Sequence, residues 1–190
     1  SHNPRSTVGT VTEIYDYLKL LFARIGRTYS PVSGKEVKKE TVTDAVDYLL
    51  SQPEGTKALI LAPFDSHRNI DFQQLISDFK HTGITRVAAD DQLLKVDGLT
   101  EDQVTNSREF CIVIDRIVIG KDEDSAVRYA DSVQDAYRLG EEVCMIHILR
   151  ENKTEKRLFS KKFEADGIKF EEPSVHMFSF NNPLGACPKC

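Results

Sequence analysis

Two short runs without charged residues, around Ala58–Phe64 and Phe110–Ile114, constrain most strongly what this chain can fold into. Each run is far too short to span a bilayer as a helix, which takes about 20 apolar residues. Each instead indicates a β-strand, at Lys57–Pro63 and at Glu109–Ile119. The first is apolar along nearly its whole length, so we expect it to lie at the centre of a sheet.

Helices and further strands alternate with these two segments. Apolar residues at spacings of three or four predict three helices: about Thr43–Ser51, Asp71–Lys80 and Asp124–Leu139. Shorter strands are predicted at Thr85–Ala89, Leu93–Val96, Val143–Leu149 and Lys156–Phe163. The order β-α-β-β-β-α-β-β predicts an α+β fold, in which helices pack on one face of a mixed or antiparallel sheet. Its middle part has the pattern of a split β-α-β unit with an inserted hairpin.

Several side chains of these elements are expected inside the domain. In the helix Asp124–Leu139, the spacing places four residues on the inner face: Val127, Ala130, Val133 and Tyr137. Cys111 and Cys144 lie within apolar runs, so we interpret them as small core side chains rather than as parts of a disulfide framework. His147 lies in an apolar strand, where a half-buried structural role is the commoner one.

The two ends of the chain differ from this middle part. A helix is predicted over about residues 10–26, with a Thr10–Glu13 capping box and an apolar stripe that needs a partner surface. Residues 27–40 form a polar connector, and residues 164–190 have neither helical nor strand periodicity. We therefore expect a flanking N-terminal helix and an irregular C-terminal segment.

Charge is unevenly distributed along the chain. The net charge of −5 divides into +3 for residues 1–40 (seven basic against four acidic) and −8 for residues 41–190 (18 against 26). Nonspecific nucleic-acid binding depends on neutralising phosphates, so the acidic part argues against DNA as the main partner. The basic start, with Arg5, leaves room for one local DNA contact. No secretion signal opens the chain, so we expect a cytoplasmic protein without membrane association.

The sequence contains no recognisable catalytic motif. Neither Gly34-Lys35 nor Gly120-Lys121 has the upstream glycine and the following hydroxyl residue of a phosphate-binding loop, and the histidines lack metal or triad spacing. The most specific pair is Cys187-Pro-Lys-Cys190, whose spacing suits zinc or thiol exchange. Since the chain has no second such pair, half of a larger metal site is favoured. A zinc or thiol module built on these two cysteines is the alternative.

Motifs along the whole chain resemble those of one family. The opening SHNPRSTVGTVTEIYDYLKLLFARIG and the closing FSFNNPLGACPKC closely resemble the UvrA family, the A subunits of excinuclease ABC in bacterial nucleotide excision repair. Between them, four shorter motifs fall in the expected order: QPEG (Gln52–Gly55), ILAP (Ile60–Pro63), VIDR (Val113–Arg116) and ADS (Ala130–Ser132). The two ends are the most specific part of the resemblance.

The resemblance implies a division of the chain and a set of partners. Residues 1–40 would belong to the first ATPase module, residues 41–163 would form the inserted domain that binds UvrB, and residues 164–190 would lead into a zinc module. The chain itself would perform no chemistry and hold no cofactor, because the nucleotide-binding motifs of the family lie outside it. The longer parent protein would bind ATP and zinc, pair with a second copy of itself and meet damaged DNA.

The resemblance also points to individual residues. A family hairpin of the form Gly-aromatic-x-Arg-x-Arg-x-Asp-Gly corresponds here to Gly83–Asp91. Arg86 and Asp90 match, whereas Ala88 replaces the second arginine and Asp91 replaces the last glycine. It implies contacts to UvrB at Arg86, Asp90 and Asp91, and at Arg68 in the preceding loop. An arginine fork suits a polar interface. The alternatives are an ordinary solvated strand position for Arg86 and, for the whole chain, a DNA contact through Arg5.

The zinc pattern of the family is incomplete in this chain. Where the family has two Cys-Pro-x-Cys pairs, the sequence reads Ser30-Pro31-Val32-Ser33 and Glu164-Ala165-Asp166-Gly167. Serine does not replace a thiolate as a zinc ligand at neutral pH. We therefore expect Cys187 and Cys190 to form a half site that holds no metal.

Overall fold

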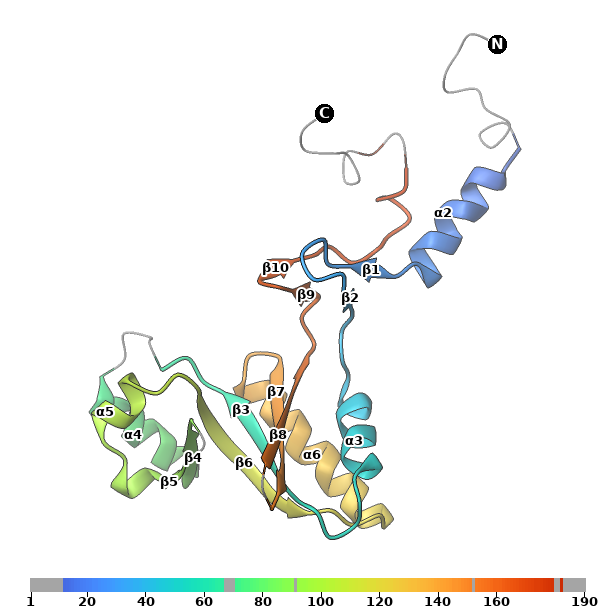
Figure 1. The fold of residues 1–190 in the computed structure, drawn as a ribbon. Helices are drawn as coiled ribbons and strands as arrows, with labels where there is room; N and C mark the ends of the chain where they lie inside the picture. Colours follow the sequence, from blue (N-terminus) through green and yellow to red (C-terminus); the bar gives the residue numbers. More distant parts are fainter. Residues whose placement is uncertain (1–11, 67–70, 91, 152, 180–181, 183–190) are drawn as a thin grey trace. The chain divides into compact units, whose positions relative to one another are not determined.

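The computed structural model describes residues 12–66, 71–90, 92–151, 153–179 and 182. The chain divides into two compact units, each described here by itself (Figure 1). The sheet unit comprises residues 39–162, and the hairpin unit comprises residues 1–38 together with 163–190.

Strands β3 to β8 form a six-stranded sheet in the order β5-β4-β6-β3-β7-β8. Their bounds are β3 (Lys57–Pro63), β4 (Arg86–Ala89), β5 (Gln92–Lys95), β6 (Phe110–Val118), β7 (Val143–Arg150) and β8 (Lys153–Ser160). Every neighbouring pair is antiparallel. The predicted central position of β3 is confirmed, because β3 lies between β6 and β7, which α6 connects as a split β-α-β unit. The predicted α+β class and order of elements are also confirmed.

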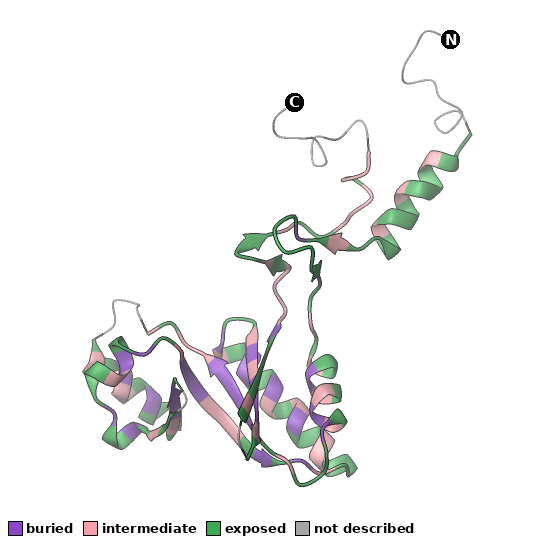
Figure 2. Ribbon diagram, in the orientation of Figure 1, coloured by how far each residue is buried: buried purple, intermediate pink, exposed green. Residues whose placement is uncertain are grey.

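The helices of the sheet unit all pack on one face of the sheet. They are α3 (Val42–Ser51), α4 (Phe72–His81), α5 (Glu101–Thr105) and α6 (Glu123–Leu139), with a 3₁₀ turn η1 at Val96–Gly98. Alternation along β3 directs Ala58, Ile60 and Ala62 toward this side, where they share one buried cluster with side chains of α3, α4, α5 and α6. Figure 2 shows β3 as mostly buried, as expected for the strand under this layer.

Local sequence explains where these helices begin. Thr41 and Asp44 form a capping box at the start of α3, and the carboxylate of Asp71 accepts hydrogen bonds from Gln73 N and Gln74 N at the start of α4. The acidic run before α6 has the same role, since Asp122 accepts a hydrogen bond from Ser125 N at 2.8 Å. Its position at a helix N-terminus accounts for this run without a metal.

The described residues of the hairpin unit form one helix and two short hairpins. The helix α2 spans Ile14–Ile25, β1 (Thr28–Tyr29) pairs with β2 (Glu36–Val37), and β9 (Glu164–Ala165) pairs with β10 (Ile168–Lys169). The helix contacts the C-terminal segment, where Phe22 lies 5.8 Å from Phe178 between ring centroids and the Tyr15 hydroxyl donates to Phe178 O at 2.5 Å. Thr10 of the expected capping box lies outside the described residues, and Glu13 precedes α2 without a side-chain cap.

Four details differ from the sequence prediction. Val127 is 58% exposed, and the buried aromatic of α6 in this region is Tyr129. The strand predicted at Lys156–Phe163 begins earlier, at Lys153. The segments predicted as connector and irregular tail contain the hairpins β1-β2 and β9-β10, whose two-residue strands are too short to show a period. The single-turn helix α5 was not predicted, although Thr100 and Gln103 form a capping box before it.

No helix in the described part of the chain is long and apolar enough to cross a membrane.

Candidate interaction surface

The face of the sheet opposite the helices is the candidate interaction surface. Leu59, Leu61, Ala88 and Cys111 form a second buried cluster on this side, to which no described helix contributes a side chain. We call this side of the sheet the uncovered face. It consists of the described strand residues of β3 to β8 whose side chains alternate with those facing the helices.

The uncovered face is basic, although the domain as a whole is acidic. Register and alternation place five cations on it: Lys57, Arg86, Lys95, Arg116 and Lys156. None of the described strand residues on this face is a carboxylate. Glu109, which directly precedes β6, is bound to Lys156 at 2.8 Å. The surface is therefore suited to an anionic or mixed-charge partner.

Arg86 lies directly opposite Lys95 on this face. The two residues are paired in the β4-β5 register, Arg86 half-buried and Lys95 exposed. Like charges directly opposite one another in an antiparallel pair repel, and this repulsion destabilises the pair. Among the described residues, no carboxylate lies within ion-pair distance of either one. An anionic group from a partner would relieve this repulsion.

A buried polar network occupies another part of the uncovered face. His147 is 4% exposed, and its Nε2 lies 3.0 Å from Met145 Sδ and 3.7 Å from Glu109 Oε1. The carboxylate of Glu109 thus bridges His147 and Lys156. Burial, with a smaller contribution from Glu109, raises the pKa of Cys111 to about 12, so the thiol stays protonated. The predicted core roles of His147 and Cys111 are confirmed.

The two described residues that the family hairpin points to, Arg86 and Asp90, lie at different places and have different contacts. Arg86 is on the uncovered face, but Asp90 is in the turn after β4 with a φ of 52°. Its Oδ1 accepts hydrogen bonds from Arg108 N at 3.0 Å and Glu109 N at 3.2 Å, so Asp90 holds the start of β6. Five other predicted site residues lie outside the described residues: Asp91, Arg68, Arg5, Cys187 and Cys190.

Sequence reasoning missed four of the five cations. Lys95, Arg116, Lys57 and Lys156 belong to different strands, and only the pairing register brings them to the face that carries Arg86. The one available signal was the alternation of charged and apolar residues, for example at Arg116 and Ile117. Alternation within a strand does not say which face is covered by helices.

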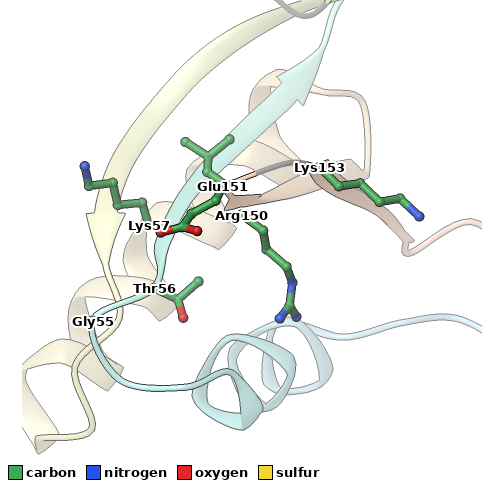
Figure 3. Close-up of a pocket in the computed structure, with 7 residues that line it drawn as sticks. Gly55, Thr56, Lys57, Arg150, Glu151 and Lys153 are labelled. Atoms are coloured by element: carbon green, nitrogen blue, oxygen red, sulfur yellow. The ribbon is translucent and has the colours of Figure 1, made fainter.

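A hollow of about 860 Å³ lies at the end of the sheet where β3 begins and β7 turns into β8 (Figure 3). Lys57, Arg150 and Lys153 line it together with Glu151. The side chains of Lys57 and Lys153 extend to opposite sides, and Arg150 is bound to Gln52 Oε1 at 3.2 Å and Glu155 Oε2 at 3.3 Å. These cations do not converge on a common point, so the hollow does not form an anion site.

No group of three His, Cys, Asp or Glu side chains within the described ranges is arranged to hold a metal ion. Cys144 is buried, and burial raises the pKa of its thiol to about 12. Neither Cys111 nor Cys144 is therefore suited to ligate a metal as a thiolate.

The fold and this surface define an α+β domain whose sheet is covered by helices on one face only. Residues 40–150 match the family model described as "UvrA interaction domain". The chain belongs to the UvrA interaction domain family.

Three relatives of the chain carry the same name. The chain is 39% identical over 191 residues to UvrABC system protein A of Methanothermobacter thermautotrophicus, covering 99% of this chain and 20% of the relative. It is 40% identical over 192 residues to the protein of that name from Bacillus subtilis and 36% identical over 200 residues to that of Rickettsia felis, covering all of this chain and 20% and 21% of the relatives. The chain therefore spans about a fifth of the length of these relatives.

Proposed function

We propose that this domain binds UvrB, and that it does so through the uncovered face around Arg86 as part of excision repair by a UvrABC system. The observation that carries the proposal is the cross-strand pair Arg86–Lys95, two cations without a carboxylate partner among the described residues. A half-buried arginine next to an exposed lysine offers charge-assisted hydrogen bonds to a carboxylate of the partner. The family membership of the chain supports an interaction role.

The domain is proposed to act by binding alone. ATP binding, pairing with a second copy, zinc binding and contact with damaged DNA are proposed for the longer cytoplasmic parent protein, which would be about five times the length of this chain. Within the chain, we propose residues 1–40 as a segment of the ATPase module, 41–163 as the UvrB-binding domain and 164–190 as the segment toward a zinc module.

Calorimetric titration of the chain with UvrB tests the proposal. We expect saturable binding near 1:1, weakened about tenfold or more by Arg86→Glu because the reversed charge repels the carboxylate it met before. Lys121→Glu, an equal charge reversal before α6 and outside the strands of the uncovered face, is the matched control and should bind like the parent chain. Unchanged binding by Arg86→Glu, or equal weakening by both variants, would contradict the proposed site.

DNA is the second candidate partner, because the same cations could neutralise phosphates. If DNA were the partner, a duplex would bind the chain at low salt, and affinity would fall steeply with salt concentration. The dependence of DNA affinity on salt concentration would then become less steep in each of three variants: Arg86→Glu, Lys95→Glu and Arg116→Glu. If a gel shift at low salt detects no binding of duplex DNA, while the chain binds UvrB, the protein partner is favoured.

A further inference from the structure

Three side chains from two remote hairpins meet at one carboxylate oxygen in the hairpin unit. The hydroxyls of Ser30 and Ser33, in the turn between β1 and β2, both donate to Oδ2 of Asp166, in the turn between β9 and β10. The Ser33 Oγ–Asp166 Oδ2 distance is 2.5 Å. We call these three residues the hydroxyl–carboxylate cluster. Ser30 lies 136 positions and Ser33 lies 133 positions before Asp166 in the chain.

The first turn is built to present both hydroxyls. Ser30 N donates to Lys35 O at 2.8 Å and Gly34 N donates to Ser30 O at 2.9 Å, which closes the turn. Each hydroxyl oxygen also accepts from the backbone two residues further on, Ser30 from Val32 N at 3.2 Å and Ser33 from Lys35 N at 3.3 Å. Ser30 is only 2% exposed. Both hydroxyls are therefore held in place and are free to donate their protons to Asp166.

The second turn is built to present the carboxylate. Asp166 and Gly167 have φ angles of 53° and 75°, the left-handed pair that a two-residue hairpin of type I′ needs. Asp tolerates this conformation better than most residues with a side chain. Asp166 thus forms the turn and accepts both hydroxyl protons. These hydrogen bonds, from Ser30 first and then Ser33, hold the pKa of Asp166 below its usual range.

The donor set does not fit zinc. Structural zinc sites use thiolate and imidazole ligands, and this cluster consists of two hydroxyls and one carboxylate. The hydroxyl protons are directed at the carboxylate, so the three oxygens satisfy one another without a cation. The resemblance implied cysteine pairs in these same two turns, at residues 30–33 and 164–167. The residues present in these turns, Ser30, Ser33 and Asp166, do not fit the zinc site that such cysteine pairs would form.

We propose that the hydroxyl–carboxylate cluster joins the two hairpins in place of a metal ion. The chain leaves the hairpin unit after Lys38 and returns to it at Phe163. The cluster therefore ties together the two segments from which the sheet unit is inserted. It keeps this junction closed in the absence of zinc.

Backbone hydrogen exchange of the whole chain, measured with and without EDTA, tests the proposal. The reporters are the amides of Ser30 and Gly34, which are protected only while the first turn is closed. We expect their protection to be insensitive to EDTA and to be lost in Asp166→Ala. Glu164→Ala is the matched control, because Glu164 lies in the same hairpin and its side chain has no hydrogen bond or ion pair among the described residues. This variant should leave protection unchanged.

Two further measurements separate local opening from general unfolding. The amides of β3 in the sheet unit are the internal reference and should remain protected in every variant. Ser30→Ala combined with Ser33→Ala leaves the Asp166-Gly167 turn intact and should also lose protection at Gly34. Loss of protection with EDTA, together with release of stoichiometric zinc, would overturn the proposal. Retained protection in Asp166→Ala and in the double variant would overturn it as well.

Discussion

Asp115 and Arg128 form a bidentate ion pair that joins α6 to the sheet. Nε and Nη2 of Arg128 lie 2.9 and 2.8 Å from the two carboxylate oxygens of Asp115. Ser132, about one turn further along α6, donates to the same carboxylate at 3.1 Å. Asp115 belongs to the VIDR segment and Ser132 to the ADS segment, so two of the segments on which the family resemblance rests meet at one contact.

A β-bulge makes this contact possible. The register between β3 and β6 shifts between Ile60 and Leu61, so Leu61 pairs with Val113 but Ile60 pairs with Asp115. Without the shift, simple alternation would place Asp115 on the same side as Val113, and Arg116 under the helices. The bulge therefore directs Asp115 toward α6 and Arg116 to the uncovered face.

The contact predicts a stability effect. Asp115→Asn should lower the free energy of unfolding by about 1–2 kcal/mol, because it removes the charge that Arg128 binds, at a site where Arg128 is largely exposed. Ser132→Ala should cost less, about 1 kcal/mol. Urea unfolding measures both. Asp131→Asn, at an exposed position of the same helix, is the control and should change stability by no more than a few tenths of a kcal/mol.

The same carboxylate predicts a dependence on pH. Burial alone would raise the pKa of Asp115, but the hydrogen bonds from Arg128, Ser132 and Arg116 N outweigh it, and the pKa lies below its usual value. A lowered pKa in the folded state stabilises the fold above the unfolded value of about 3.9, and this contribution is lost as the pH falls through the folded value. The stability difference between the parent chain and Asp115→Asn should therefore shrink in acid. A difference that stays constant from neutral pH into that range would show that the charge contributes nothing.

Tyr129 predicts a second stability effect at the end of β6. Its ring is 2% exposed, and its hydroxyl accepts from Gly120 N at 2.8 Å and lies 3.2 Å from Val118 O. Tyr129→Phe leaves Gly120 N without this partner and should lower the free energy of unfolding by about 1–3 kcal/mol. Tyr17→Phe, at a ring that is 72% exposed, should have almost no effect. Equal unfolding midpoints for the two variants would contradict this role of the hydroxyl.

The buried cysteines predict low thiol reactivity. Burial is the main reason that the pKa values of Cys111 and Cys144 are raised to about 12, and only a thiolate reacts fast with disulfide reagents. In a chain carrying Cys187→Ser and Cys190→Ser, the two remaining thiols should react slowly when folded and fully in urea. Reaction of the folded chain at the rate of the unfolded one would contradict the buried positions.

Much of the sheet unit could be predicted because its elements have strong local patterns. β3 and β6 were recognisable from apolar composition, and α4 from the spacing of Phe72, Leu75, Ile76 and Phe79, which pack on the core. Val127 was assigned to the inner face of α6 by spacing alone. A rotation of the helix that brings Tyr129 to the core leaves Val127 in solvent. Spacing within one helix does not define which side the sheet will occupy.

The surface could be predicted only in part, because it depends on pairing between strands. The resemblance pointed to Arg86. The β4-β5 register places Lys95 on the same face, and the bulge opposite Ile60 and Leu61 places Arg116 there, but neither can be read from the sequence alone. Asp90 was expected to contact the partner, whereas its carboxylate accepts backbone hydrogen bonds. Whether it also contacts UvrB stays a prediction. The hydroxyl–carboxylate cluster joins residues more than 130 positions apart, which no local pattern shows.

The central claim is that the uncovered face is the surface that meets UvrB. Hydrogen exchange of the sheet unit with and without saturating UvrB tests it most directly. The proposal predicts slowed exchange in the edge strand β5 and the turn before it, with α6 on the opposite face unchanged. Slowed exchange confined to the outer side of α6, or no change at β5 under saturation, would contradict it.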